Sequence, residues 1–185
     1  MRIIGGKLRG RKLQTFKGSD VRPTSDRVRE SLFNILGSKP VDNAVLDLFS
    51  GTGALGIEAL SRGAEMAVFV DHSVHALAVL NKNLERCALE KRTQVIQWNI
   101  VNNLRCLKAF PHTFGLVFMD PPYHHGLVPL TIKHLLQSHC LAAGAVLVAE
   151  HEIHPAPDID AIQLACIDSR RYGRTGLSFF SFSPV

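Results

Sequence analysis

The sequence predicts an α/β fold around a mostly parallel sheet of seven strands, with a basic hairpin and helix in front of it. Two observations support this prediction. Short apolar runs alternate with amphipathic stretches from residue 44 to residue 151, and two adjacent strand-like runs close the chain. Alternating strands and helices favour a parallel sheet with helices on both faces, and the two last runs favour an antiparallel hairpin. We therefore divide the chain into an N-terminal extension, residues 1–42, and a main unit, residues 43–185.

The elements of the main unit follow from these patterns in chain order. Apolar runs such as "AVLDLF" and "MAVFVD" predict strands at 44–49, 66–71, 93–98, 114–120, 145–151, 161–173 and 175–182. Stretches with helical periodicity predict helices at 53–63, 73–89 and 127–141, and a short helix near 101–109. Gly63 ends the first of these helices and Ser73 is the candidate N-cap of the second.

The N-terminal extension carries the positive charge of the chain. Residues 2–6 and 11–15 are expected to form two short strands around a glycine turn, and residues 22–37 a helix that has Thr24 as N-cap and carries Arg27 and Arg29 on its more polar side. Residues 1–42 hold ten Lys or Arg against four Asp or Glu, whereas the rest of the chain is nearly neutral. This asymmetry predicts a polyanionic partner, nucleic acid first. The candidate phosphate contacts are Lys7, Arg9, Arg11, Lys12, Arg27 and Arg29.

Composition narrows the class of protein. A hydrophobic content of 46% and a charged content of 20% indicate an ordinary globular protein, and no apolar run is long enough to span a membrane. Four cysteines without a C-x-x-C pair and an N-terminus without a signal-peptide core favour a reducing, cytoplasmic location. The histidine pairs lack zinc-ligand spacing, so we predict no metal site.

A glycine-rich loop follows the first strand of the main unit. "LDLFSGTGALGIEAL" places Gly51 and Gly53 between strand and helix, where the backbone can lie against a nucleotide-like cofactor. Asp71 ends the next strand and can accept both hydroxyls of a ribose, in a dinucleotide as well as in S-adenosylmethionine. Asp47, in the pattern D-x-F-x-G-x-G, favours S-adenosylmethionine. The alternatives are a loop-stabilising role for Asp47 and a helix-capping role for Asp71.

The stretch "FGLVFMDPPY" ends a strand in an acid, two prolines and an aromatic residue. We expect this strand beside residues 44–49, which would put Asp120 next to the glycine loop. Asp120 and the Pro121 carbonyl can accept hydrogen bonds, Pro122 has no N–H to compete, and Tyr123 offers a stacking face. Such a site suits a base with an exocyclic amine that attacks a methyl sulfonium. Two adjacent donors on guanine favour guanine over adenine.

Several segments together resemble the RsmD family, which are bacterial 16S rRNA guanine-N2 methyltransferases. The segments are "RIIGGKLRGRKL", "RPTSDRVRESLFNIL", "DLFSGTGALGIEALSRGA", "MDPPY", "EH" at 150–151 and "RRYGRTGLSFF". The resemblance implies a class I methyltransferase fold, S-adenosylmethionine as donor, and N2 of guanine 966 as target. It also implies a monomer that acts on the 30S subunit while the subunit assembles.

The resemblance also implies roles for single residues. Asp47, Gly51 and Gly53 would line the cofactor loop, Asp71 would take the ribose, and Asp120 to Tyr123 would hold the guanine. Arg22, Pro23 and Thr24 would close over the methionine end of the cofactor. Many relatives have an acid near the adenine where this chain has "QWNI", so Asn99 is expected to replace it and Ile100 to pack on the ring.

Three other functions stay open at this point. They are an amino-methyltransferase acting on DNA adenine-N6 or another RNA, a dinucleotide-dependent oxidoreductase, and a non-catalytic RNA-binding assembly factor.

Overall fold

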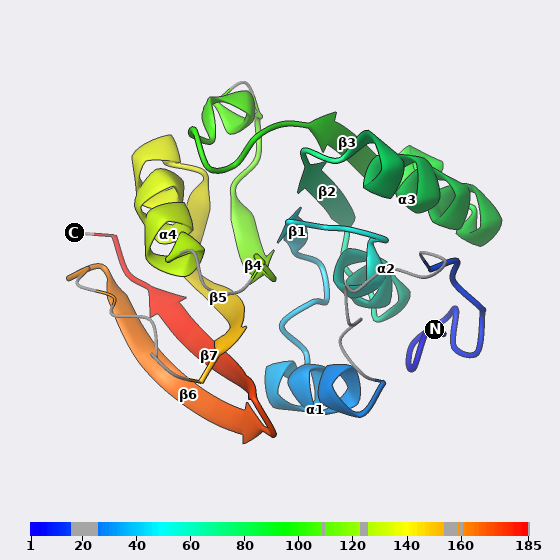
Figure 1. Ribbon diagram of the computed structural model, residues 1–185, viewed down its shortest axis with the longest axis horizontal. Coiled ribbons are helices and arrows are strands. Elements are labelled where there is room, and N and C mark those ends of the chain that lie inside the picture. The colour runs from blue at the N-terminus through cyan, green and yellow to red at the C-terminus, as the bar shows by residue number, and fades with distance from the viewer. Residues whose placement is uncertain (16–25, 109, 123–125, 154–158, 160, 185) are drawn as a thin grey trace.

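The computed structural model describes residues 1–15, 26–108, 110–122, 126–153, 159 and 161–184 (Figure 1). Its centre is a seven-stranded sheet in the order β3-β2-β1-β4-β5-β7-β6. Strands β1 to β5 are parallel, and β7 is antiparallel to both β5 and β6. The predicted mostly parallel sheet with a closing hairpin is confirmed. The strands are β1 (Ala44–Leu48), β2 (Met66–Asp71), β3 (Thr93–Gln97), β4 (Phe114–Met119), β5 (Leu141–Glu152), β6 (Leu164–Tyr172) and β7 (Thr175–Phe182).

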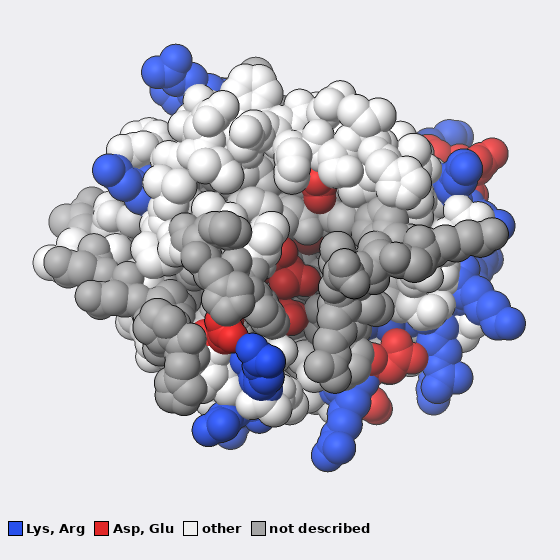
Figure 2. All heavy atoms as spheres, viewed as in Figure 1, with Lys and Arg blue, Asp and Glu red and all other residues white. Residues whose placement is uncertain are grey.

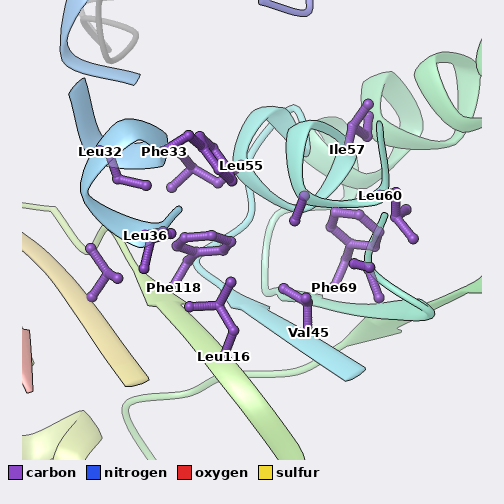
Figure 3. Packing of buried hydrophobic residues seen from close by; sticks show 14 of the residues in the cluster. Leu32, Phe33, Leu36, Val45, Leu55, Ile57, Leu60, Phe69, Leu116 and Phe118 are labelled. Carbon is purple, nitrogen blue, oxygen red and sulfur yellow. The ribbon is translucent and has the colours of Figure 1, made fainter. Parts of the chain in front are cut away.

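Helices cover both faces of this sheet. Those in the described ranges are α1 (Asp26–Leu36), α2 (Ala54–Ser61), α3 (Val74–Cys87) and α4 (Leu127–Ser138), with short 3-10 turns at Glu90–Arg92 and Arg105–Leu107. None of these helices has the length and hydrophobicity needed to cross a membrane. Helices α1, α2 and α3 pack on one face, where Phe33 and Leu55 meet Val45 and Phe118 of the sheet (Figure 3). Helix α4 packs on the other face, against Leu46 and its neighbours.

The central strands are apolar on both faces because each successive side chain enters the opposite core. Val45 belongs to the cluster under α1 and α2, and Leu46 to the cluster under α4. Both side chains are fully buried. This explains why β1 appears in the sequence as a continuous apolar run interrupted only by Asp47.

Three predicted boundaries are corrected. The helix expected at 127–141 ends at Ser138, because His139 takes a left-handed backbone with φ of 52°. Leu141 already belongs to β5, where it pairs with Phe114 before a register shift. The short helix expected near 101–109 is only the 3-10 turn Arg105–Leu107.

The N-terminal segment, residues 1–15, forms a loose hairpin and not the two regular strands that the sequence suggested. It has one isolated antiparallel bridge, Arg2 to Lys12. The hydrogen bonds Ile3 N–H to Arg11 O and Leu13 N–H to Met1 O hold its two arms together, at 3.0 and 3.1 Å. Glycine turns replace a longer ladder, so the segment depends on the rest of the protein for its conformation.

Helix α2 supplies that support. The Glu58 carboxylate accepts from the backbone N–H of Ile4 and of Gly5, each at 2.8 Å, and from Arg62 Nε at 2.8 Å. Gly6 has a φ of 74°, and a Cβ there would stand 1.9 Å from the Ser61 carbonyl oxygen. Only glycine therefore permits this close approach of the N-terminal segment to α2.

Arg29 in α1 is a further correction. The sequence placed Arg29 on the polar side of the helix as an RNA contact, but its side chain is 0% exposed. Arg29 Nη2 donates to the Arg2 carbonyl at 2.7 Å and to Asp26 Oδ1 at 2.8 Å. Arg29 therefore joins α1 to the N-terminal segment and presents no surface to an RNA phosphate. Arg27 is exposed as expected, whereas Thr24 lies outside the described residues.

Candidate active site

The carboxyl ends of β1, β2 and β4 meet at one edge of the sheet. Leu48 is in register with Val70 on one side and with Met119 on the other. The glycine loop, Asp71 and Asp120 follow directly after these positions. The chain order reverses between β1 and β4, which is the switch point where open α/β sheets bind ligands. The expected adjacency of β1 and β4 is confirmed.

The glycine loop has a strained entrance and an unsatisfied hydroxyl. Phe49 has a φ of 58°, a left-handed conformation that is costly for a side chain of this size and is typical of functional sites. Gly51 and Gly53 have φ of 53° and 79°. Ser50 Oγ is buried, with no hydrogen-bond partner among the described residues. A polar ligand over the loop would satisfy that hydroxyl. Sequence reasoning missed both Phe49 and Ser50.

Asp47 organises the loop from below. It is 2% exposed, and its Oδ2 accepts from the Gly56 N–H at the start of α2, at 2.9 Å. A Cβ on Gly56 would stand 2.4 Å from the Phe69 ring and 3.1 Å from Asp47 Oδ2, so glycine permits this contact. Desolvation by burial raises the pKa of Asp47 to about 8, in spite of the Gly56 hydrogen bond, and the nearby Asp71 charge adds to the rise. This contact is the loop-orienting role that the sequence offered as one possibility.

Asp71 also holds the loop, from the end of β2. Its Oδ2 accepts from the Gly51 N–H at 2.8 Å and its Oδ1 from the Ser73 N–H at 2.9 Å. Ser73 in turn caps α3 by accepting from Ala76 N–H at 3.2 Å, as predicted. A carboxylate has about four lone-pair sites. Asp71 therefore retains acceptor capacity for ribose hydroxyls while it fixes the glycine loop.

The Asp-Pro-Pro stretch lies at the neighbouring strand end. Asp120 is half-buried directly after β4, Pro121 is buried and Pro122 is exposed. Tyr123 lies outside the described residues. On the other side of Asp120, β5 is in register through Met119 and Ala149, so Glu150 follows at the same edge and is 8% exposed. Sequence reasoning assigned no site role to Glu150, although an acid at the end of a buried strand was a usable signal.

The expected adenine contacts are only partly supported. Asn99 is exposed, and its Oδ1 accepts from the Val101 N–H at 3.1 Å, which leaves its amide N–H groups for a ligand. Ile100 is 2% exposed and packs in the core with Leu104 and Leu107. The Ile100 side chain therefore has little exposed surface for the expected packing on the adenine.

Charge is distributed unevenly over this face of the molecule. Figure 2 shows acidic side chains near its middle and many Lys and Arg side chains around the rim, several of them where Figure 1 places α3 and the N-terminal segment. Lys7, Arg9, Arg11 and Lys12 are all exposed. Arg11 Nη1 donates to the Arg86 carbonyl at the end of α3, at 3.1 Å. A polyanion bound to the rim would thus lie beside the strand ends.

Among the described residues, no three His, Cys, Asp or Glu side chains gather as possible metal ligands.

The strand order and the site at the switch point define a class I methyltransferase fold, which is Rossmann-like. Residues 1–181 match the family described as Conserved hypothetical protein 95. The chain belongs to this family, and the predicted RsmD resemblance is confirmed.

Named relatives agree with this assignment. The chain is 42% identical to the ribosomal RNA small subunit methyltransferase D of Escherichia coli K12 over 153 residues, which is 83% of this chain and 75% of the relative. It is 38% identical to the Haemophilus influenzae protein of the same name, over 82% of this chain and 79% of the relative. A solved structure titled "Putative methyltransferase yhhF from Escherichia coli" superposes with a TM-score of 0.85 at 35% identity, covering 99% of this chain and 98% of that one.

Proposed function

We propose that the protein transfers a methyl group from S-adenosylmethionine to the exocyclic N2 of guanine 966 in 16S rRNA of the assembling 30S subunit. The observation that carries this proposal is the position of Asp120 and Pro121, directly after β4 and beside the glycine loop that follows β1. Relatives named as ribosomal RNA small subunit methyltransferases support the RNA substrate.

The glycine loop fits the proposed cofactor. A Cβ at Gly51 would meet no atom closer than 3.9 Å, so a ligand can approach the backbone there. Ser50 Oγ lacks a partner among the described residues, and Asp71 keeps acceptor capacity. When bound, S-adenosylmethionine would supply an electrophilic methyl group on a positively charged sulfur. Asp71 and Glu150 lie at the same edge of the sheet, so the local charge is complementary to a sulfonium.

Residues of the protein then position the guanine amine. Asp120 accepts a hydrogen bond from one N–H of the guanine amine, and the Pro121 carbonyl accepts from another. These bonds turn the amine out of conjugation with the ring and aim its lone pair. In the transfer the N–C bond would form as the S–C bond breaks, which would leave adenosylhomocysteine, and the methylated amine would lose one proton to water. Tyr123 stacks on the flipped base, in line with its sequence position. No covalent enzyme intermediate is needed.

RNA would be held by the N-terminal extension. The exposed cations are Lys7, Arg9, Arg11, Lys12 and Arg27. They would contact phosphates, and Thr24 and its neighbours would close the cofactor site. In this scheme residues 1–42 form the RNA-binding extension and residues 43–185 the catalytic unit of a monomer that works in the cytoplasm.

The test is a transfer assay with radiolabelled S-adenosylmethionine and three substrates: 30S particles that lack the methyl mark, naked 16S rRNA, and duplex DNA. We expect label on the 30S particles. Label only on DNA would overturn the proposed substrate. Thermal stabilisation by NADH and not by adenosylhomocysteine would overturn the proposed cofactor.

A further inference from the structure

Asn83 lies in α3 at the point where three segments of the chain meet. Its side chain is 0% exposed. Oδ1 accepts from the Gln14 N–H at 2.7 Å, and Nδ2 donates to the Gln14 carbonyl at 3.2 Å and to the Thr52 carbonyl at 3.0 Å. Two carbonyls need the amide N–H groups and one N–H needs the amide oxygen, so the orientation of the side chain is fixed.

The two partners of Asn83 belong to segments with different proposed functions, RNA binding and cofactor binding. Gln14 ends the arm that carries Arg11 and Lys12, and Thr52 lies between Gly51 and Gly53 in the glycine loop. Leu13 beside Gln14 is buried in the core under α2 and α3, which fixes this end of the arm. One buried side chain therefore bonds the basic arm to the proposed cofactor loop.

This arrangement has a consequence for binding. Gln14 is held through both its N–H and its C=O, so Asn83 must move with Gln14 or lose two hydrogen bonds. The Asn83 side-chain amide also holds the Thr52 carbonyl. The orientation of the Thr52 peptide in turn affects how the neighbouring N–H groups of the glycine loop point. Ordering of one segment thus favours order in the other.

We propose that Asn83 is a positioning residue that couples RNA binding by the N-terminal segment to cofactor binding by the glycine loop. The inference rests on the proposed function. Asn83 touches neither ligand, and it acts through Gln14 and Thr52. Because such coupling is reciprocal, RNA tightens cofactor binding by the same factor by which cofactor tightens RNA binding.

The experiment measures the dissociation constant of adenosylhomocysteine by calorimetry, with and without a 16S rRNA fragment containing guanine 966. For the wild type, RNA should lower this constant. Asn83→Ala should raise the constant of the RNA-free protein by roughly two- to tenfold and abolish the effect of RNA. Asn83→Asp should behave likewise. It keeps the side-chain volume and the bond from Gln14 N–H, but a carboxylate cannot donate to Thr52.

Asn81→Ala is the matched control, because Asn81 is exposed two positions earlier in the same helix. It should keep both the affinity and the coupling. A merely structural role for Asn83 would lower the melting temperature and leave the coupling of the folded protein intact. If Asn83→Ala does not fold, the effect of RNA on adenosylhomocysteine binding is measured with Asn83→Asp alone.

The outcomes separate this inference from the proposed function. Wild-type protein that binds the RNA without any effect on adenosylhomocysteine would overturn the coupling and leave the methyl transfer standing, as would variants that retain the full coupling. Wild-type protein that binds no RNA and methylates none would overturn both.

Discussion

The Asp47 carboxyl accepts a hydrogen bond from the Gly56 N–H at 2.9 Å across the turn between β1 and α2. Strand and helix are thereby joined beneath the glycine loop, at a carboxyl group that is 2% exposed. Burial raises its pKa from 3.8 to about 8, so the folded protein keeps this proton near neutral pH.

Asp47→Asn should change how stability depends on pH. Between about pH 4 and pH 8 the unfolded chain has released the Asp47 proton and the folded chain keeps it, so wild-type stability falls as pH rises. Asparagine does not titrate, and its amide oxygen can still accept from Gly56. As pH rises through this window, the unfolding free energy of the wild type should therefore fall more steeply than that of the variant, by about 1.4 kcal/mol per pH unit. Urea unfolding at several pH values measures this, and parallel profiles would contradict the raised pKa.

Glu58→Ala should release the N-terminal segment from α2. The substitution leaves the N–H groups of Ile4 and Gly5 and the Arg62 guanidinium without their carboxylate, at a cost of roughly 3 kcal/mol in unfolding free energy. Amide hydrogen exchange at Ile4 and Gly5 should accelerate. The control Glu65→Ala removes an exposed acid and should stay within about 0.5 kcal/mol. Unchanged exchange at Ile4 would show that other contacts hold the segment.

The salt dependence of RNA binding should separate exposed from buried arginines. Lys7→Ala and Arg9→Ala should each reduce the slope of log K against log salt by about 0.7 to 0.9. Arg29→Met should leave that slope unchanged, because the Arg29 side chain is 0% exposed. Filter binding over a range of salt concentrations measures the slopes. A reduced slope for Arg29→Met with unchanged slopes for the other two would reverse our assignment.

Asp120→Ala should separate catalysis from cofactor binding. Loss of a preorganised acceptor for the amine should lower turnover by roughly a hundredfold or more. The affinity for adenosylhomocysteine should stay the same, because the described cofactor loop is organised by Asp47 and Asp71. Single-turnover kinetics and calorimetry together measure this, with Glu90→Ala as an exposed-acid control. Full turnover in Asp120→Ala would mean that another group holds the amine.

Periodicity predicted the sheet well, because buried parallel strands leave a strong apolar signal. The runs at 44–49 and 66–71 became β1 and β2 with ends shifted by at most one residue. The ends of α4 and β5 were predicted less well. His139 adopts a left-handed backbone without a glycine or proline to announce it, and the Ala-rich start of β5 looks like the end of a helix.

The positions of site residues could be predicted where local sequence places the residue at the end of a strand. They could not be predicted where contacts with distant parts of the chain determine the role of the residue. Asp120 and the glycines were found from their position after a strand. Arg29 could not be placed, since one of its two partners is a backbone carbonyl 27 residues away. Asn83 gave no signal either, because a single asparagine in an amphipathic helix looks like an exposed polar residue until Gln14 and Thr52 are seen beside it.

The most direct test of the central claim is to map the modified nucleotide after reaction with 30S particles that lack the mark. Nuclease digestion and mass spectrometry identify both the base and the methylated atom. We predict one N2-methylguanosine, at position 966 of 16S rRNA, and its absence with Asp120→Ala. A methyl group on another nucleotide or another atom, or N6-methyladenine formed only in DNA, would contradict the proposed function.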